Sequence, residues 1–131
     1  MKVVLDANVL LAAFAARGLC EAVYQVCLGK HEIALSEHIL TEVRRGLAAK
    51  LKLGTAHVDQ IMALIRENAQ IVKPAKIPAN ACRDSDDLPV LGTLAAAQAD
   101  CLVTGDHDLL TLKEFSGIPI LSPRAFHDRL R

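Results

Sequence analysis

The stretch VVLDANVLL, residues 3–11, decides the fold of this chain. Its first residues, 3–5, form a short β-branched run that is typical of a buried strand. The run ends at Asp6 and Asn8, which are typical of a polar turn, and an apolar helical pattern follows over residues 9–16. The stretch therefore predicts a strand, a turn and a helix in immediate succession.

The same arrangement of a strand stopped by polar residues returns twice. Residues 33–35 end at Ser36, and residues 101–103 end at Thr104, with Asp106 two positions later. Helical patterns separate these strands, and such alternation is typical of a parallel sheet with helices on both faces. We therefore expect an α/β fold, a three-layer α/β/α sandwich around a central parallel sheet of four to five strands.

Start and stop signals place the other elements. Gly29 is expected to end a helix over residues 19–28. The side chains of Ser36 and of either Asp86 or Asp87 are expected to cap the helices that follow them. The remaining expected elements are a helix at 56–69, a minor edge strand at 71–72, a helix at 88–99, a short helix near 108–114, a strand at 118–121 and a final helix capped by Ser122.

The charges balance in number but not in position. The chain has 15 basic and 15 acidic residues, so net charge alone gives no reason to invoke nucleic acid or a membrane. Acids dominate residues 84–108, whereas a basic cluster consists of Arg44, Arg45, Lys50 and Lys52. Such a cluster is more often a solvated helix face, but beside an acidic site it is also the pattern of a phosphate track for RNA.

Composition also bears on the compartment. The four cysteines show no CxxC pair or zinc-ribbon spacing, which favours reduced thiols in or near the core of a cytosolic protein. Asp6 and Asn8 interrupt the first apolar run, unlike the core of a signal peptide. No segment approaches the roughly 18 apolar residues of a membrane span. We expect a cytoplasmic protein with no membrane association.

The polar residues that end the strands point to a common site. Parallel strands share one carboxyl edge, so Asp6 and Asp106 are expected to meet there beside two hydroxyl side chains. Glu42, at the border of an inward helix face, and Asp87, at a helix start, can join them. Each acid alone could be a turn former, a helix cap or a solvated residue. Four together would repel one another unless protonated or neutralised by a cation such as Mg²⁺ or Mn²⁺, and such a site can hydrolyse a phosphodiester.

Four segments carry a family resemblance: VVLDANVLL (3–11), ALSEHILTEV (34–43), RDSDDLPVLGTLAAAQADCLVTGDHDLL (83–110) and IPILSP (118–123). In this order they resemble PIN domains, and they look most similar to the small VapC-like toxins of bacterial toxin–antitoxin pairs. The resemblance covers nearly the whole chain. It implies that residues 1–131 form a single PIN-like domain with a Rossmann-like sandwich. It also implies a metal-dependent endoribonuclease that is often dimeric and commonly inhibited by an antitoxin.

The resemblance extends to individual residues. It implies that catalysis and the binding of Mg²⁺ or Mn²⁺ belong to Asp6, Glu42, Asp87 and Asp106. The register of the late acids stays open among Asp84, Asp86 and Asp87; we favour Asp87 because a buried helix face follows it. Asp108 could replace or assist Asp106. The supporting residues are then Asn8, Ser36, Thr104, Asp84 and Asp108.

Two other classes of protein share parts of this pattern. A PIN-like module could hold RNA or a protein without cutting, but a binding surface gains little from carboxylates clustered beside a polyanion. A phosphoacceptor domain also places aspartates at strand ends, yet it prefers a lysine at the end of a later strand, and the strand ends here offer none. The expected partners are an RNA substrate, a protein antitoxin and a second copy of the chain.

Overall fold

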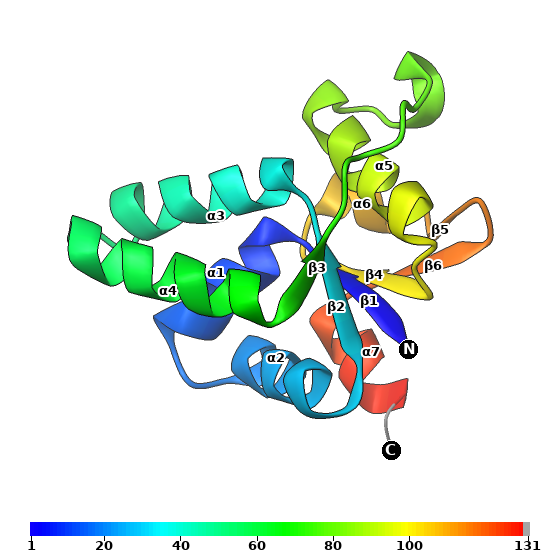
Figure 1. Cartoon of the computed structure of the whole chain (residues 1–131). Coiled ribbons are helices and arrows are strands. Elements are labelled where there is room, and N and C mark those ends of the chain that lie inside the picture. The colour runs from blue at the N-terminus through cyan, green and yellow to red at the C-terminus, as the bar shows by residue number, and fades with distance from the viewer. Residues whose placement is uncertain (130–131) are drawn as a thin grey trace.

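The computed structural model describes residues 1–129, and at their centre is a six-stranded sheet. The strands lie in the order β3-β2-β1-β4-β6-β5, and every neighbouring pair is parallel except β5 and β6 (Figure 1). The strands are β1 (Lys2–Leu5), β2 (Glu32–Leu35), β3 (Ala69–Ile71), β4 (Cys101–Val103), β5 (Glu114–Phe115) and β6 (Ile118–Leu121). The predicted α/β class with a central parallel sheet is confirmed.

The sheet has more strands than the four to five expected, and its antiparallel edge strand was not predicted. β5 returns to β6 through Ser116 and Gly117, whose φ angles of 50° and 79° are both positive. Two successive positive φ angles are typical of a type I′ hairpin turn. Serine is a weak signal for that turn, so the sequence pattern did not indicate the hairpin. The short helix expected to reach residue 114 ends instead at Leu110.

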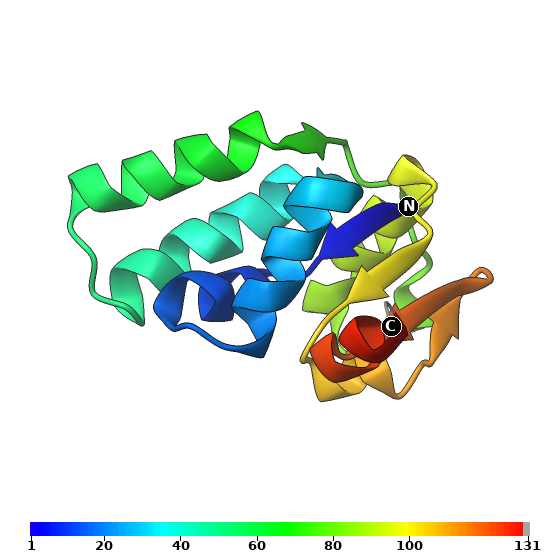
Figure 2. The same ribbon diagram turned by 90° about the horizontal axis from the view of Figure 1, so that it is seen from below.

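Helices cover both faces of the sheet. They are α1 (Ala7–Ala15), α2 (Leu19–Lys30), α3 (Glu37–Ala49), α4 (Thr55–Glu67), α5 (Leu88–Ala97), α6 (His107–Leu110) and α7 (Pro123–Arg129), with 3-10 turns η1 (Ala79–Ala81) and η2 (Ser85–Asp87). α2 and α7 pack together on one face, and α5 lies on the other against β1 and β2 (Figure 2). α3 and α4 pack side by side and extend away from the sheet, and α1 lies against α3.

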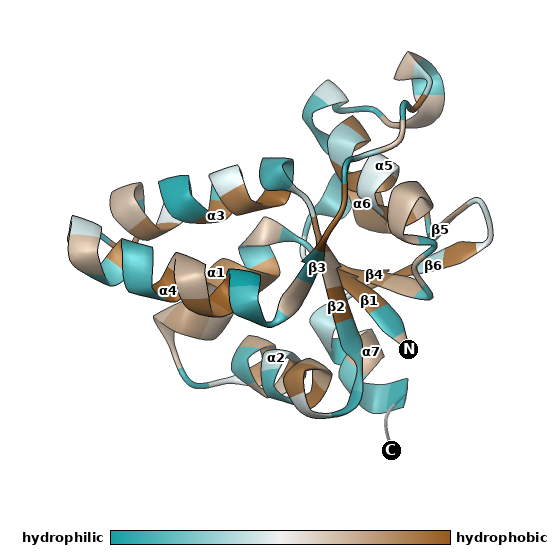
Figure 3. Ribbon diagram, viewed as in Figure 1, coloured by the Kyte–Doolittle hydropathy of each residue, from teal (hydrophilic) through white to brown (hydrophobic). Residues whose placement is uncertain are grey.

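The core is aliphatic and continuous through the central strands. Residues 3–5 of β1 and 101–103 of β4 are buried, so successive side chains on both faces of the sheet are apolar. This continuous pattern is expected of parallel strands that are covered on both sides, and in Figure 3 much of the central strands is brown, whereas the helices around them alternate between brown and teal. Within residues 1–129 no single helix has the length and apolar character to cross a membrane; α1 and α2 meet that test only jointly, as a pair bent by 107°.

Two serine caps were predicted correctly, and one glycine stop was not. Ser36 caps α3, because its Oγ accepts a hydrogen bond from Ile39 N at 3.5 Å. Ser122 likewise accepts from Ala125 N at 3.1 Å at the start of α7. Gly29, expected to end α2, lies inside that helix. A glycine is tolerated there at a cost of about 1 kcal/mol relative to alanine, so it is only a weak stop signal.

The start of α5 also differs from the expectation. Neither Asp86 nor Asp87 caps the helix with its side chain. The capping carboxyl is Asp84, whose Oδ1 accepts from Asp86 N at 2.9 Å at the beginning of η2. Because this extra turn precedes α5, the carboxyl of Asp87 makes no capping hydrogen bond and is available for other contacts.

Candidate active site

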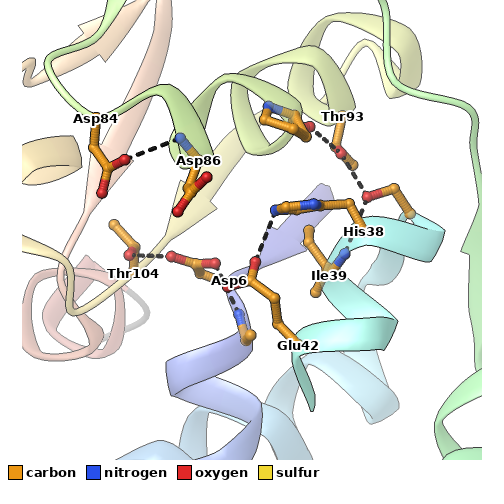
Figure 4. Close-up of polar contacts among 11 residues, drawn as sticks. Asp6, His38, Ile39, Glu42, Asp84, Asp86, Thr93 and Thr104 are labelled. Atoms are coloured by element: carbon orange, nitrogen blue, oxygen red, sulfur yellow. Dashed lines mark hydrogen bonds and ion pairs between the residues drawn. The ribbon is translucent and has the colours of Figure 1, made fainter. Parts of the chain in front are cut away.

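Asp6 follows β1 directly and is held from two sides. Thr104, which follows the neighbouring strand β4, donates its hydroxyl to Asp6 Oδ2 at 2.7 Å. The other oxygen, Oδ1, accepts from Ala7 N at 2.8 Å at the start of α1 (Figure 4). Asp6 and Thr104 are both buried. The carboxylate therefore has a fixed orientation at the carboxyl edge of the sheet.

The turn after β4 is tied to the same place. Thr104 Oγ1 accepts a hydrogen bond from Asp106 N at 3.0 Å, so one hydroxyl links Asp6 to the backbone of Asp106. Asn8 Oδ1 accepts from Gly105 N at 3.1 Å and fastens the turn to α1. Asp106 Oδ1 accepts from the N–H of Asp108 at 3.0 Å and caps α6. Thr104 and Asn8 therefore brace the two aspartates that follow β1 and β4.

A pocket of about 400 Å³ opens at this edge of the sheet. Acids from four separate segments line it: one after β1, one on α3, one at the start of α5 and one after β4. These are the predicted residues Asp6, Glu42, Asp87 and Asp106. The predicted supporting residue Asn8 also lines the pocket, whereas Ser36, Thr104, Asp84 and Asp108 lie outside its lining.

Asp87 connects the pocket with a second group of acids. Its ligand oxygen and those of Asp84 and Asp108 all lie within 4.8 Å of one another, which makes this the tightest acidic group within residues 1–129. Asp87 is buried, Asp108 is half-buried and Asp84 is exposed. Cys82, also buried, places its Sγ 3.9 Å from Asp87 Oδ2. Asp84, one of the alternatives to Asp87, and Asp108, the alternative to Asp106, thus both lie beside Asp87.

Glu42 has a close neighbour that was not predicted from the sequence. His38 Nε2 lies 2.8 Å from Glu42 Oε1, one helical turn earlier on α3 (Figure 4). The spacing of four residues on one helix was the available signal. Figure 4 also shows the carboxyl of Asp86 extending from η2 toward the same space as Asp6 and Glu42. His38 therefore contacts one acid of the pocket without itself being part of the pocket lining.

Burial and mutual repulsion raise the pKa of three of these acids. Burial is the largest cause for Asp87, and its contact with Asp106 together with the charges of Asp106, Asp84 and Asp6 adds to it, bringing its pKa to about 7. Burial also raises the pKa of Asp6, although the hydrogen bond from Thr104 opposes that shift. The pKa of Glu42 is raised by burial while His38 opposes the rise. Anionic oxygens crowded in this way are a suitable donor set for a hard divalent cation.

The basic cluster predicted from the sequence divides in two. Arg45 and Lys50 line the pocket on the α3 side. Arg44 instead faces α4, where its guanidinium donates to Asp59 Oδ1 at 2.9 Å. Lys52 lies beyond the end of α3, outside the pocket lining. Two of the four cations can therefore reach a ligand beside the acids without rearrangement.

Ser36 has a structural partner rather than a place in the pocket. Thr93, fully buried in α5, donates its hydroxyl to Pro89 O at 2.7 Å, and its Oγ1 lies 2.9 Å from Ser36 Oγ, whose hydroxyl can donate to it. Thr93 was not predicted from the sequence, where its only signal is a hydroxyl within an otherwise apolar helix. The pair ties the beginning of α3 to α5. Glu42 lies on α3, and α5 begins directly after Asp87.

Comparisons with known proteins agree with this architecture. The model of the PIN domain matches residues 2–108. Among solved structures, the chain is similar to the crystal structure of VapBC2 from Rickettsia felis bound to a DNA fragment from their promoter, with a TM-score of 0.64 and 17% identity, over 93% of this chain and 98% of that chain. No curated protein matches the chain. At such low identity the structural likeness establishes the fold, and the family model spans all four acids of the pocket. This chain therefore belongs to the PIN domain family.

Proposed function

We propose that this chain is a Mg²⁺- or Mn²⁺-dependent endoribonuclease and the toxin of a toxin–antitoxin pair. One observation carries the proposal: Asp6, Glu42, Asp87 and Asp106 come from four distant segments and line one pocket. Local structure does not require that convergence, since a turn former or a cap works equally well at any strand end. We also propose that residues 1–131 act as a single domain in the cytoplasm.

The donor set of the pocket fits a hard divalent cation. Mg²⁺ and Mn²⁺ prefer carboxylate oxygens and retain water ligands. Asp6 and Asp106 would hold the ion from the ends of β1 and β4, and Asp87 would approach from the start of α5. When bound, the ion would supply Lewis acidity for attack on a phosphodiester and offset the charge that develops on its oxygens.

The protein's own residues have separable tasks around that centre. Thr104 fixes the orientation of Asp6 and the backbone of Asp106 through one hydroxyl. Glu42 is half-exposed beside the buried acids, and its raised pKa makes it a better acceptor for the proton of an attacking water. His38, in contact with Glu42, would orient that carboxyl toward the pocket.

The central test is a cleavage assay with a matched pair of variants. Purified protein supplied with Mg²⁺ or Mn²⁺ is expected to cut single-stranded or structured RNA, and Asp6→Asn should lower the rate by a factor of about 100 or more because it removes one anionic ligand. Glu67→Gln, an equally conservative change at an exposed position on α4, should cleave like the wild type. Equal rates for Asp6→Asn and the wild type would refute the assignment of the site.

The proposal also covers partners. The resemblance to VapC-like toxins supports a protein antitoxin and a homodimer, and the fold is shared with VapBC2, solved bound to promoter DNA. Induced expression of the wild type in a bacterial host should arrest growth, whereas Asp6→Asn should not. RNA binding that survives a chelator without any cleavage product would favour a non-cleaving PIN-like module instead.

A further inference from the structure

The pocket that holds the acids extends along α3 as a groove facing α1. Glu42 lies at its acidic end, and Lys50 lies about two helical turns further on, ~12 Å along the helix axis. Leu11 of α1 and Gly46 and Ala49 of α3 line the space between these ends. The pocket is thus acidic at one end, apolar in the middle and basic at the other.

The apolar middle exists because α1 and α3 approach closely at a glycine. A Cβ added to Gly46 would lie 2.4 Å from Leu11 Cδ1, so any side chain at this position would displace Leu11. Ala49, one helical turn later, is exposed and small. The middle of the groove therefore has an aliphatic floor, which consists of Leu11 packed against Gly46 and of the small Ala49.

The basic end of the groove is free to accept an anion. Arg45 and Lys50 are exposed, and neither forms an ion pair with any other residue between 1 and 129. Arg44 differs, because Asp59 already engages it. A ligand that suits all three parts of the pocket carries one phosphate at the acidic end, an apolar ring above the floor and another phosphate near the two cations.

We propose that this groove is a subsite for one unpaired nucleotide adjoining the scissile phosphate. The base and ribose lie on Leu11, Gly46 and Ala49, and the outer phosphate lies between Arg45 and Lys50. The inference rests on the proposed function, since it takes the acids as the cleavage centre. The volume of about 400 Å³ is near the lower end of the ~300–1,000 Å³ typical of small-ligand pockets, which suits a single nucleotide.

The chemistry of the floor sets the kind of selectivity. No aromatic side chain lines the pocket within residues 1–129, so the base is not held by ring stacking. Aliphatic side chains offer no hydrogen bonds to base edges, and they therefore discriminate by size rather than by base identity. Filling the floor should accordingly penalise a purine more than a pyrimidine.

Binding of short fluorescent oligoadenylate and oligouridylate, measured by anisotropy in a cleavage-deficient Asp6→Asn parent with Mg²⁺, tests the subsite. Ala49→Leu fills the floor and should raise the Kd for oligoadenylate about tenfold, with a smaller rise for oligouridylate. Ala48→Leu is the matched control, because Ala48 is exposed on the same helix but outside the pocket lining. It should leave both Kd values within about twofold.

Salt dependence tests the phosphate contact separately. Arg45→Gln should lower the slope of log Kd against log salt by about 0.7, the value for one contact to a single strand. Lys30→Gln, at the opposite end of the sheet, should leave the slope unchanged.

The subsite is overturned if the probes do not bind, if Ala49→Leu behaves like Ala48→Leu, or if the purine is not the more strongly affected probe. The same holds if Arg45→Gln and Lys30→Gln give equal slopes. Cleavage by the wild type distinguishes the two proposals: cleavage without these binding differences leaves the nuclease and removes the subsite, whereas these differences without cleavage leave a nucleotide groove and remove the nuclease.

Discussion

Replacement of Asp87 by asparagine should stabilise the metal-free protein, although Asp87 belongs to the candidate site. The folded state raises the pKa of this carboxyl from 3.8 to about 7. The folded protein therefore keeps a proton that the unfolded chain releases, so stability is lost as pH rises from about 4 to about 7 and stays constant above that. Asparagine carries no proton to lose and avoids this penalty.

The size of the effect follows from the shift. A rise of about three units corresponds to ~4 kcal/mol at 1.36 kcal/mol per unit, for an isolated group. Part of the rise comes from the charges of Asp106, Asp84 and Asp6, whose side chains can move apart on unfolding or rearrange around a variant. The wild type should therefore lose about 2 kcal/mol of unfolding free energy relative to Asp87→Asn when the pH is raised from about 5 to about 8.

Urea unfolding in the presence of a chelator, at both pH values, measures this difference. Added Mg²⁺ should reverse the order, because a ligand that binds only the folded state stabilises it in proportion to its affinity, and the wild type should bind more tightly than Asp87→Asn. Glu67→Gln should follow the wild type throughout. A wild type that is more stable than Asp87→Asn at about pH 8 without metal would refute the account of a buried, repelled carboxyl.

Three further predictions concern other contacts. Thr104→Val should lower the free energy of unfolding by about 1–3 kcal/mol, because it removes the donor to Asp6 and the acceptor of a backbone N–H, and it should weaken Mg²⁺-induced stabilisation, whereas Thr104→Ser should restore both. Gly92→Ala should cost about 1–3 kcal/mol in chemical denaturation, since its Cβ would lie 2.3 Å from the carbonyl oxygen of Ala75 on the crossing segment; an unchanged midpoint would contradict that close approach. Arg66→Ala should change the free energy of unfolding by less than about 1 kcal/mol, although Arg66 donates two hydrogen bonds of 2.7 Å to Glu37, because this ion pair is largely exposed. A larger loss in urea unfolding would contradict this.

The sequence predicted the acids at the strand ends because their placement follows from topology. Once the strands at residues 3–5 and 101–103 are parallel neighbours, Asp6 and Asp106 must share an edge, and the pocket does contain both. The prediction that Glu42 joins the site required only the helical spacing of the apolar residues and a helix start at Ser36. These inferences depend on regular geometry, which a single sequence can reveal.

The features that the sequence did not predict depend on tertiary contacts. Arg44 and Arg45 are adjacent, about 100° apart around the helix axis. Which of them faces the pocket depends on where α4 packs, and Asp59 of α4 engages Arg44. Asp84 is the residue that caps η2, but the sequence could not show this, because Asp84, Asp86 and Asp87 have the same intrinsic tendency to cap a helix. The hairpin of β5 depends on a positive φ at Ser116, a conformation that serine seldom signals.

The hydroxyl of Thr104 joins residues 98 positions apart in the chain, and the bond from Asn8 to the turn after β4 spans 97. Contacts so distant in sequence are slow to form during folding, because a long loop must close first. A nascent chain that has left the ribosome only as far as α4 already carries Asp6 and Glu42, yet it lacks the strand that aligns them. The proposed nuclease would thus stay inert until β4 and the turn that follows it have been made and have docked beside β1.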